Sequence, residues 1–254
     1  MTLLILPMIA CLALVWIHIL FGQHVIRRGI IFIDLALAQW AALGYLIGHI
    51  LHIESPALLF TTAFLFSGLA GIILTGLRPF FSGQNKQEAL IGVMYIMGNT
   101  MATAIIATQG LEGHHLSEML AGHILFVSSQ TIAFSIMIYA ICAFLLRIIY
   151  QNVATSSRAF DILFYGLFGL VVTSSVKMVG VLLVFSYLVI PLLTTGLFTQ
   201  RDHPQKIAAW AIGMAGSGSG LLLSLFTDIP ASYSIILTLG ILLLIGIIFR
   251  KWLV

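Results

Sequence analysis

Long apolar runs, separated by short polar connections, occupy almost the whole chain. A helix needs about 20 apolar residues to cross the hydrocarbon core of a bilayer, and runs near this length can be marked along the sequence. They cover residues 2–21, 30–51, 56–77, 89–109, 121–147, 161–176, 178–199, 207–226 and 231–249. The pattern therefore predicts an all-α protein, a polytopic transmembrane helical bundle with about nine spans.

The number of spans depends on the stretch 160–199, where the apolar sequence is interrupted only by the residues from Ser174 to Lys177. A tight outer turn and a re-entrant break both fit this interruption, so eight spans are the alternative. Farther along, Pro191 lacks an amide donor and its ring clashes with the preceding turn. A helix there is expected to bend and to leave carbonyl groups for water, an ion or nearby hydroxyls. Those hydroxyls belong to Ser186, Thr194 and Thr195.

Composition excludes several classes of protein. Hydrophobic residues make up 61% of the 254 residues and charged residues 7%, whereas about 25% of residues are charged in soluble domains. No polar connection is long enough to bury a core of its own, so residues 1–254 are expected to form a single transmembrane domain. The run 3–21 continues without a cleavage-site pattern, which indicates an uncleaved anchor. The basic residues are thinly spread over the connections, so nucleic acid is not expected as a partner.

Sequence motifs for nucleotide and protease chemistry are absent. The chain contains no G-x-x-x-x-G-K-[ST] loop for ATP phosphates and no H-E-x-x-H pair for a zinc protease. It is therefore not expected to be an enzyme, and any ATP used would bind another chain. The run Gly216–Gly220 resembles a phosphate loop only superficially, because it lies within an apolar run. Small residues at this spacing favour close packing of two membrane helices.

Lysine and arginine residues mark alternate connections, as the positive-inside rule describes for cytoplasmic loops. The connections after His52, Glu112 and Thr227 contain none, and only Lys177 departs from the alternation. The C-terminus is therefore expected in the cytoplasm and the N-terminus outside. The basic connections and the C-terminal end contain Arg27, Arg28, Arg78, Lys86, Arg147, Arg158, Arg201, Lys206, Arg250 and Lys251.

Two polar residues, Asp34 and Gln39, lie within the second apolar run. An ionised carboxylate deep in the membrane costs at least about 2.5 kcal/mol, so Asp34 is expected to face the protein interior or a wet cavity. It would either pair with Arg27 or Arg28 or take part in transport. Because residues five apart differ by about 140° around a helix, Asp34 and Gln39 need not share one face.

Imidazole and carboxylate groups gather in the outward connections. This combination suits zinc, manganese or iron, but no spacing forms a closed ligand set, and docking of a partner is an equal alternative. The candidates for outer metal capture or docking are His49, His52, Glu54, His114, His115 and Glu118.

Several blocks of sequence resemble the ABC-transporter permeases that import zinc, manganese or iron. Three blocks carry most of the resemblance, and together with two looser ones they follow the family's order over nearly the whole chain. The three are VIRRGIIFIDLALAQWAALG at 25–44, HLSEMLAGHILFVS at 115–128 and FDILFYGLFGLVVTSSVKMVGVLLVFSYLVIPLLTTG at 160–196. The looser ones are QEALIGVMY at 87–95 and TDIPASYSIILTLG at 227–240.

The resemblance implies a homodimeric permease in the bacterial cell membrane, with cytoplasmic ATPase subunits and an extracytoplasmic metal-binding protein. A divalent metal would be the transported substrate, and no permanently bound cofactor is expected. Family members commonly read G-D-A-L-S-H-A before a helix glycine. Aligning that glycine with Gly44 puts Gln39 at the histidine and Leu35 at the aspartate, so Asp34 replaces the aspartate only if the helix turns by about 100°. The candidate translocation residues are Asp34, Gln39, Pro191, Ser186 and Thr194.

Coupling to an ATPase would use a cytoplasmic connection, and the candidate is 150–163, with Arg158 and Asp161 as the coupling residues. This segment would form either an interfacial helix or a simple connection. Two rival functions remain. A secondary transporter driven by an ion gradient would need paired broken helices, and the chain has one break, at Pro191. A scaffold subunit without transport activity would tolerate the missing histidine.

Overall fold

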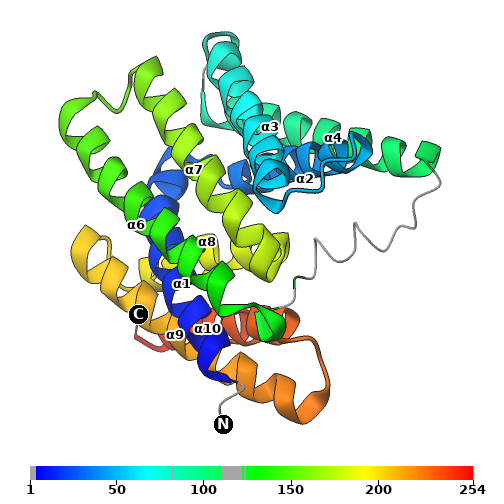
Figure 1. The fold of residues 1–254 in the computed structure, drawn as a ribbon. Helices are drawn as coiled ribbons and strands as arrows, with labels where there is room; N and C mark the ends of the chain where they lie inside the picture. Colours follow the sequence, from blue (N-terminus) through cyan, green and yellow to red (C-terminus); the bar gives the residue numbers. More distant parts are fainter. Residues whose placement is uncertain (1–3, 82, 110–121, 123, 254) are drawn as a thin grey trace.

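The computed structural model describes residues 4–81, 83–109, 122 and 124–253, and Figure 1 shows their arrangement. Within these residues the fold is all-α, with nine α-helices, two short 3-10 helices and no strand. The α-helices are α1 (Ile5–Arg28), α2 (Ile33–Ile50), α3 (Pro56–Leu77), α4 (Gln84–Gln109), α6 (Ser129–Asn152), α7 (Arg158–Val179), α8 (Val181–Gly196), α9 (Asp202–Thr227) and α10 (Ala231–Leu253). The 3-10 helices are η2 (Arg78–Phe80) and η3 (Ile124–Phe126).

The predicted all-α bundle is confirmed, and eight of the helices are long and apolar enough to cross a membrane. The exception is α8, which has 16 residues. At about 1.5 Å per residue it reaches roughly 24 Å, less than the ~30 Å hydrocarbon core. The described chain therefore has eight full-length spans and one short apolar helix, in place of nine equivalent spans.

The break between α7 and α8 falls at Gly180, with φ 80° and ψ 161°. The expected interruption at 174–177 is wrong, because these residues continue α7 to Val179. Ser174 and Ser175 both donate to the carbonyl of Val171, at 2.9 and 2.6 Å. Back-bonding of this kind lets hydroxyl side chains remain inside a helix, whereas the positive φ at Gly180 favours glycine and ends it.

The helices form two groups that α7 and α1 connect (Figure 1). In one group, α2 packs against α3 and α4. In the other, α8 packs against α1, α9 and α10, and much less against α7. The short helix α8 therefore lies within the second group and does not form a paired hairpin with the helix before it.

Glycines allow the closest helix approaches in both groups. A Cβ atom on Gly22 of α1 would lie 2.4 Å from the carbonyl oxygen of Leu188 on α8, and one on Gly44 of α2 would lie 2.6 Å from that of Thr62 on α3. Real Cβ atoms do not approach backbone so closely, so glycine is required at these crossings. Small residues serve the same purpose throughout membrane bundles.

The glycine–serine run of α9 packs against α10, as its spacing predicts. A Cβ atom would lie 2.4 Å from a side-chain atom of Leu239 if placed on Gly216, and 2.5 Å from the Cα of Ile235 if placed on Gly220. A Cβ atom on Gly218 would meet nothing within 4 Å. Two of the three glycines therefore form the contact surface, and the packing interpretation is confirmed.

Candidate functional site

Asp34 lies in the first turn of α2 and is 1% exposed. Neither of its carboxylate oxygens has a hydrogen-bond partner among the described residues. The amide groups of a first helical turn favour negative charge, so the start of α2 provides part of the compensation that an ionised carboxylate needs there. A positively charged ligand would compensate the rest of the negative charge of Asp34.

The two arginines proposed as partners for Asp34 bind other carboxylates. Arg27 forms an ion pair with Asp202. Arg28 forms one with Asp161, with 2.6 Å between Nη1 and Oδ1. The alternative in which Asp34 is only a counter-ion for Arg27 or Arg28 is therefore wrong.

A second carboxylate, that of Glu88 on α4, lies at the same end of α2. Its Oε1 accepts a hydrogen bond of 3.0 Å from the amide of Phe32, two residues before Asp34. Its Oε2 is buried and has no partner within the described part of the chain. Glu88 is not among the candidate residues that the sequence pattern indicates. Its place near the start of an apolar run was the available signal, but only the packing of α4 on α2 brings it close to Asp34.

Gln39 is also buried, on the side of α2 that faces α4. A Cβ atom on Gly98 of α4 would lie 3.2 Å from the Cβ of Gln39 and 2.9 Å from the ring of Trp40. Trp40 donates to the carbonyl of Met94 on α4 over 2.9 Å. Although Asp34 and Gln39 lie about 140° apart around the helix, both are buried because neighbouring helices surround α2.

The hydroxyl groups near Pro191 bond within α8. Ser186 donates to the carbonyl of Leu182 and Thr194 to that of Ile190, both over 2.8 Å. Helix α8 continues through Pro191 to Gly196. These hydroxyl groups were expected to bind carbonyl groups left free by a bend at Pro191. Each of them instead donates to a carbonyl of the preceding turn of α8.

The hydroxyl group of Tyr187 forms a polar contact that sequence reasoning missed. It lies 2.7 Å from Oγ of Ser217 on α9 and donates to Sγ of Cys11 on α1, over 3.3 Å. Tyr187 is fully buried. These contacts connect α8 with α1 and α9, two of the three helices against which it packs.

The outward histidines that the structure describes are exposed. His49 lies in the last turn of α2 with its ring 4.7 Å from that of Tyr45, and His52 and Glu54 follow in the connection to α3. No group of three histidine, cysteine or acidic residues able to hold a metal occurs in the described part of the chain. The other candidates, His114, His115 and Glu118, lie outside the described residues.

Asp161 is the centre of a buried charge network. It is 0% exposed and binds Arg28, at the end of α1, with one oxygen and Arg78, in η2, with the other. The ends of α1 and α3 and the start of α7 therefore meet on one side of the bundle. The positive-inside pattern of the sequence predicts that all three of these helix ends face the cytoplasm.

The connection between α6 and α7 is short and contains no helix of its own. Helix α6 ends at Asn152 and α7 begins at Arg158, where the Ser157 hydroxyl accepts a hydrogen bond from the amide of Phe160 over 3.1 Å. The interfacial helix considered for 150–163 is therefore not formed, because a serine cap starts the long helix at once. Arg158 is exposed, in contrast to Asp161.

A model of the ABC 3 transport family matches residues 1–250. The chain belongs to the ABC 3 transport family. This membership confirms the resemblance inferred from the sequence blocks and makes the chain a membrane component of an ABC transporter. None of the curated proteins compared matches it.

Solved structures share the fold of this ABC 3 family member. One is "PsaBC from Streptococcus pneumoniae in complex with Fab", with a TM-score of 0.78 and 21% sequence identity, over 97% of this chain and 91% of that chain. Another is described as a metal-chelate type ABC transporter in an inward-facing conformation, with a TM-score of 0.67 and 16% identity, over 97% and 87%. At these identities the likeness is one of fold.

Proposed function

We propose that this ABC 3 family member is the membrane permease of an ATP-driven importer for a divalent transition metal, namely zinc, manganese or iron. The observation that carries the proposal is the buried Asp34 carboxylate, which has no protein partner among the described residues. An uncompensated charge within a membrane bundle is unfavourable unless a ligand or a proton relieves it. A passing cation provides that relief, and family membership makes transport its context.

In this proposal, Asp34 binds the ion electrostatically within a medium of low dielectric constant, where one charge has a large effect. Gln39 contributes an uncharged polar group farther along α2. Glu88 adds carboxylate character at the same helix end, because its Oε2 is free of described partners. Carboxylate oxygens suit manganese, whereas imidazole suits the later metals, so this oxygen-rich set favours manganese within the proposed group.

The short helix α8 belongs to the proposed path through Ser186, Pro191 and Thr194. The hydroxyl groups of Ser186 and Thr194 donate their protons to carbonyls of the preceding turn. An ion would therefore bind the oxygen atoms of these hydroxyls. Their lone pairs remain available for that purpose. Helix α8 packs between α1, α9 and α10, which makes it a candidate for the element that moves during alternating access.

The chain contains no motif for ATP phosphates, so the energy must come from separate cytoplasmic ATPase subunits. We infer that two copies of the permease assemble with two ATPases, and that an extracytoplasmic protein delivers the metal. The exposed Arg158, at the start of α7, is proposed to take part in coupling to the ATPase. Asp161 is buried, and its proposed part in coupling is to transmit movement from the start of α7 to α1 and η2.

The outward residues gather metal or receive the delivery protein. His49, His52 and Glu54 are exposed and remain accessible for either role. His114, His115 and Glu118 are proposed for the same function on sequence grounds. Loss of these groups should weaken uptake only when metal is scarce, since mass action compensates for a weaker capture step.

Growth of a metal-import mutant under chelation tests this proposal. The permease gene should restore growth only with its ATPase gene, and not with an ATPase that cannot hydrolyse ATP. Restoration by the permease alone would indicate a transporter driven by an ion gradient. No restoration with any ATPase, from a chain that reaches the membrane, would indicate a scaffold.

A further inference from the structure

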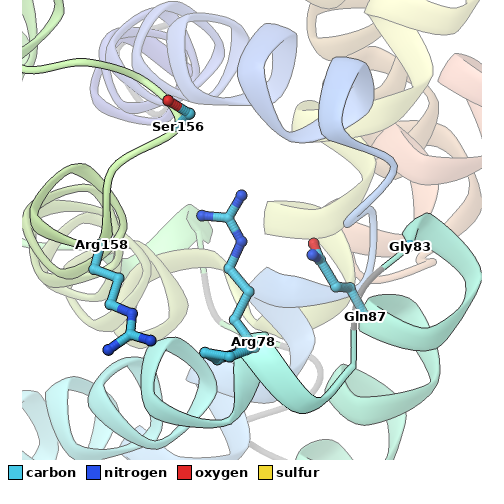
Figure 2. Close-up of a pocket in the computed structure, with 6 residues that line it drawn as sticks. Arg78, Gly83, Gln87, Ser156 and Arg158 are labelled. Carbon is cyan, nitrogen blue, oxygen red and sulfur yellow. The ribbon is translucent and has the colours of Figure 1, made fainter.

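A cavity of about 410 Å³ opens where η2 and the start of α4 approach the connection between α6 and α7. Its volume lies within the ~300–1,000 Å³ range of small-molecule sites. Figure 2 shows the guanidinium group of Arg78 in the space between Ser156 and Gln87, with the side chain of Arg158 alongside Arg78 and extended in the opposite direction. All four side chains are polar, and none of them is acidic.

Positive charge is in excess around this cavity. Arg28 and Arg78 share the one carboxylate of Asp161, and Arg158 forms no ion pair with any described residue. Among Arg28, Arg78, Arg158 and Asp161, three positive charges and one negative charge leave a net charge of +2. In addition, Nη2 of Arg28 is buried and has no acceptor in the described part of the chain.

The backbone at the rim adds further donors. Gly83 lines the cavity with φ 107°, and a Cβ atom there would meet nothing within 4 Å. Helix α4 begins directly after it, and the first amide groups of a helix lack acceptors within the helix. Such amides favour anions. The nearby acidic residue, Glu88, directs its Oε1 to the amide of Phe32 instead.

The surroundings point to the membrane as the source of the anion. Arg78 and Arg158 lie at the ends of the candidate spans Pro56–Phe80 and Arg158–Val179, which is the level of lipid headgroups. Next to them in sequence, Phe80, Ile162 and Leu163 are 77%, 47% and 44% exposed. A headgroup phosphate in the cavity would therefore have acyl chains beside apolar side chains.

We propose that this cavity binds the phosphate group of an anionic phospholipid, in the leaflet at which the basic connections of the protein lie. Basic pockets between membrane helices on that side are suited to anionic headgroups. The site binds the phosphate through Arg78, Arg158, Gln87 and Ser156. It thereby connects the lipid to the Asp161 network, which joins α1, η2 and α7. This proposal does not depend on which ion the protein transports.

Lipid retention, measured by native mass spectrometry on the purified full chain, tests the site. Phosphatidylglycerol and phosphatidylcholine with identical acyl chains are offered together. The wild type should retain the anionic lipid preferentially. Ser156→Glu, which adds a carboxylate at the cavity, and Arg158→Gln should each reduce this preference about fivefold, as expected for one charge near the membrane surface. Arg158→Lys should retain most of it.

Thr155→Glu is the matched control, because it places the same charge in the same exposed connection at a residue that does not line the cavity. It should leave the preference unchanged. Equal loss in Thr155→Glu and Ser156→Glu would contradict a defined site, as would equal retention of the two lipids by the wild type. Both variants should elute and melt like the wild type, so a loss of lipid cannot come from misfolding.

Two further measurements, competition with inorganic phosphate and addition of the ATPase, distinguish the source of the anion. Inorganic phosphate in hundredfold excess should not displace phosphatidylglycerol, and complete displacement would make free phosphate the ligand. The purified ATPase is then added. If Ser156→Glu weakens ATPase binding while lipid retention is unaffected, the cavity receives an acidic group of the ATPase and the proposal is wrong.

Discussion

Nη1 of Arg28 lies 2.6 Å from Oδ1 of Asp161, although the two residues are 133 positions apart in the chain. Arg28 ends α1, and Asp161 lies in the first turn of α7. The second oxygen of Asp161 binds Arg78. One buried carboxylate therefore joins three separate segments on the basic side of the bundle.

Replacing Asp161 by asparagine should strongly destabilise the protein. The change leaves Arg28 and Arg78, whose side chains are only 15% and 28% exposed, without their shared counter-charge. Loss of one partner from a buried ion pair costs about 3–5 kcal/mol. Thermal unfolding of the purified variant in detergent should show a large decrease in melting temperature.

The matched control for this change is Arg27→Gln. Arg27 and Asp202 also form an ion pair, but their side chains are 52% and 57% exposed. Such surface pairs contribute about 1 kcal/mol or less, so the melting temperature should hardly change. A similar effect of both variants would show that the Asp161 network does not hold the bundle together.

Accessibility of introduced cysteines tests the proposed orientation. Ser156→Cys should react with an impermeant reagent only from the cytoplasmic side, and Ser55→Cys only from outside, because basic residues mark the first connection and not the second. Both serines are exposed, and the native Cys11 and Cys142 are buried, so the background should be low. Labelling of Ser156→Cys on intact cells would indicate the opposite orientation in the membrane and contradict this prediction.

The glycine–serine run allows a test of helix packing within five residues. Gly220→Ala should destabilise the protein by about 1–3 kcal/mol, since its Cβ would lie 2.5 Å from the Cα of Ile235. Gly218→Ala meets open space and should be neutral or slightly stabilising, because alanine favours helix. Melting temperatures in detergent compare the two, and equal values would contradict the assigned α9–α10 contact.

Much of the fold follows from hydropathy, because lipid permits only helices or closed barrels to span it. The length of apolar runs therefore located the helices well. The end of α7 was misplaced because polar residues are usual markers of a break, whereas Ser174 and Ser175 bond back to Val171. Gly180, the residue that ends the helix, is a single glycine within an apolar sequence.

The candidate site was less predictable, because its properties depend on contacts between distant segments. The sequence indicated that Asp34 must face the interior, and it is 1% exposed. It did not indicate that Arg28 would bind Asp161, or that Glu88 would bond to the start of α2. Several carboxylates were available to each arginine, and only the packing of the helices decides which one it reaches.

The most direct measurement is ATP-dependent metal uptake by Asp34→Asn in proteoliposomes that contain the ATPase and the delivery protein. Asparagine keeps the size of the side chain and removes the charge that compensates a divalent ion. Uptake should fall at least about tenfold at every metal concentration, while the complex still assembles. Asp228→Asn is the control, because Asp228 is exposed and has φ 55°, a conformation that asparagine also adopts. It should transport like the wild type. Normal uptake by Asp34→Asn at all metal concentrations would contradict an ion path through Asp34.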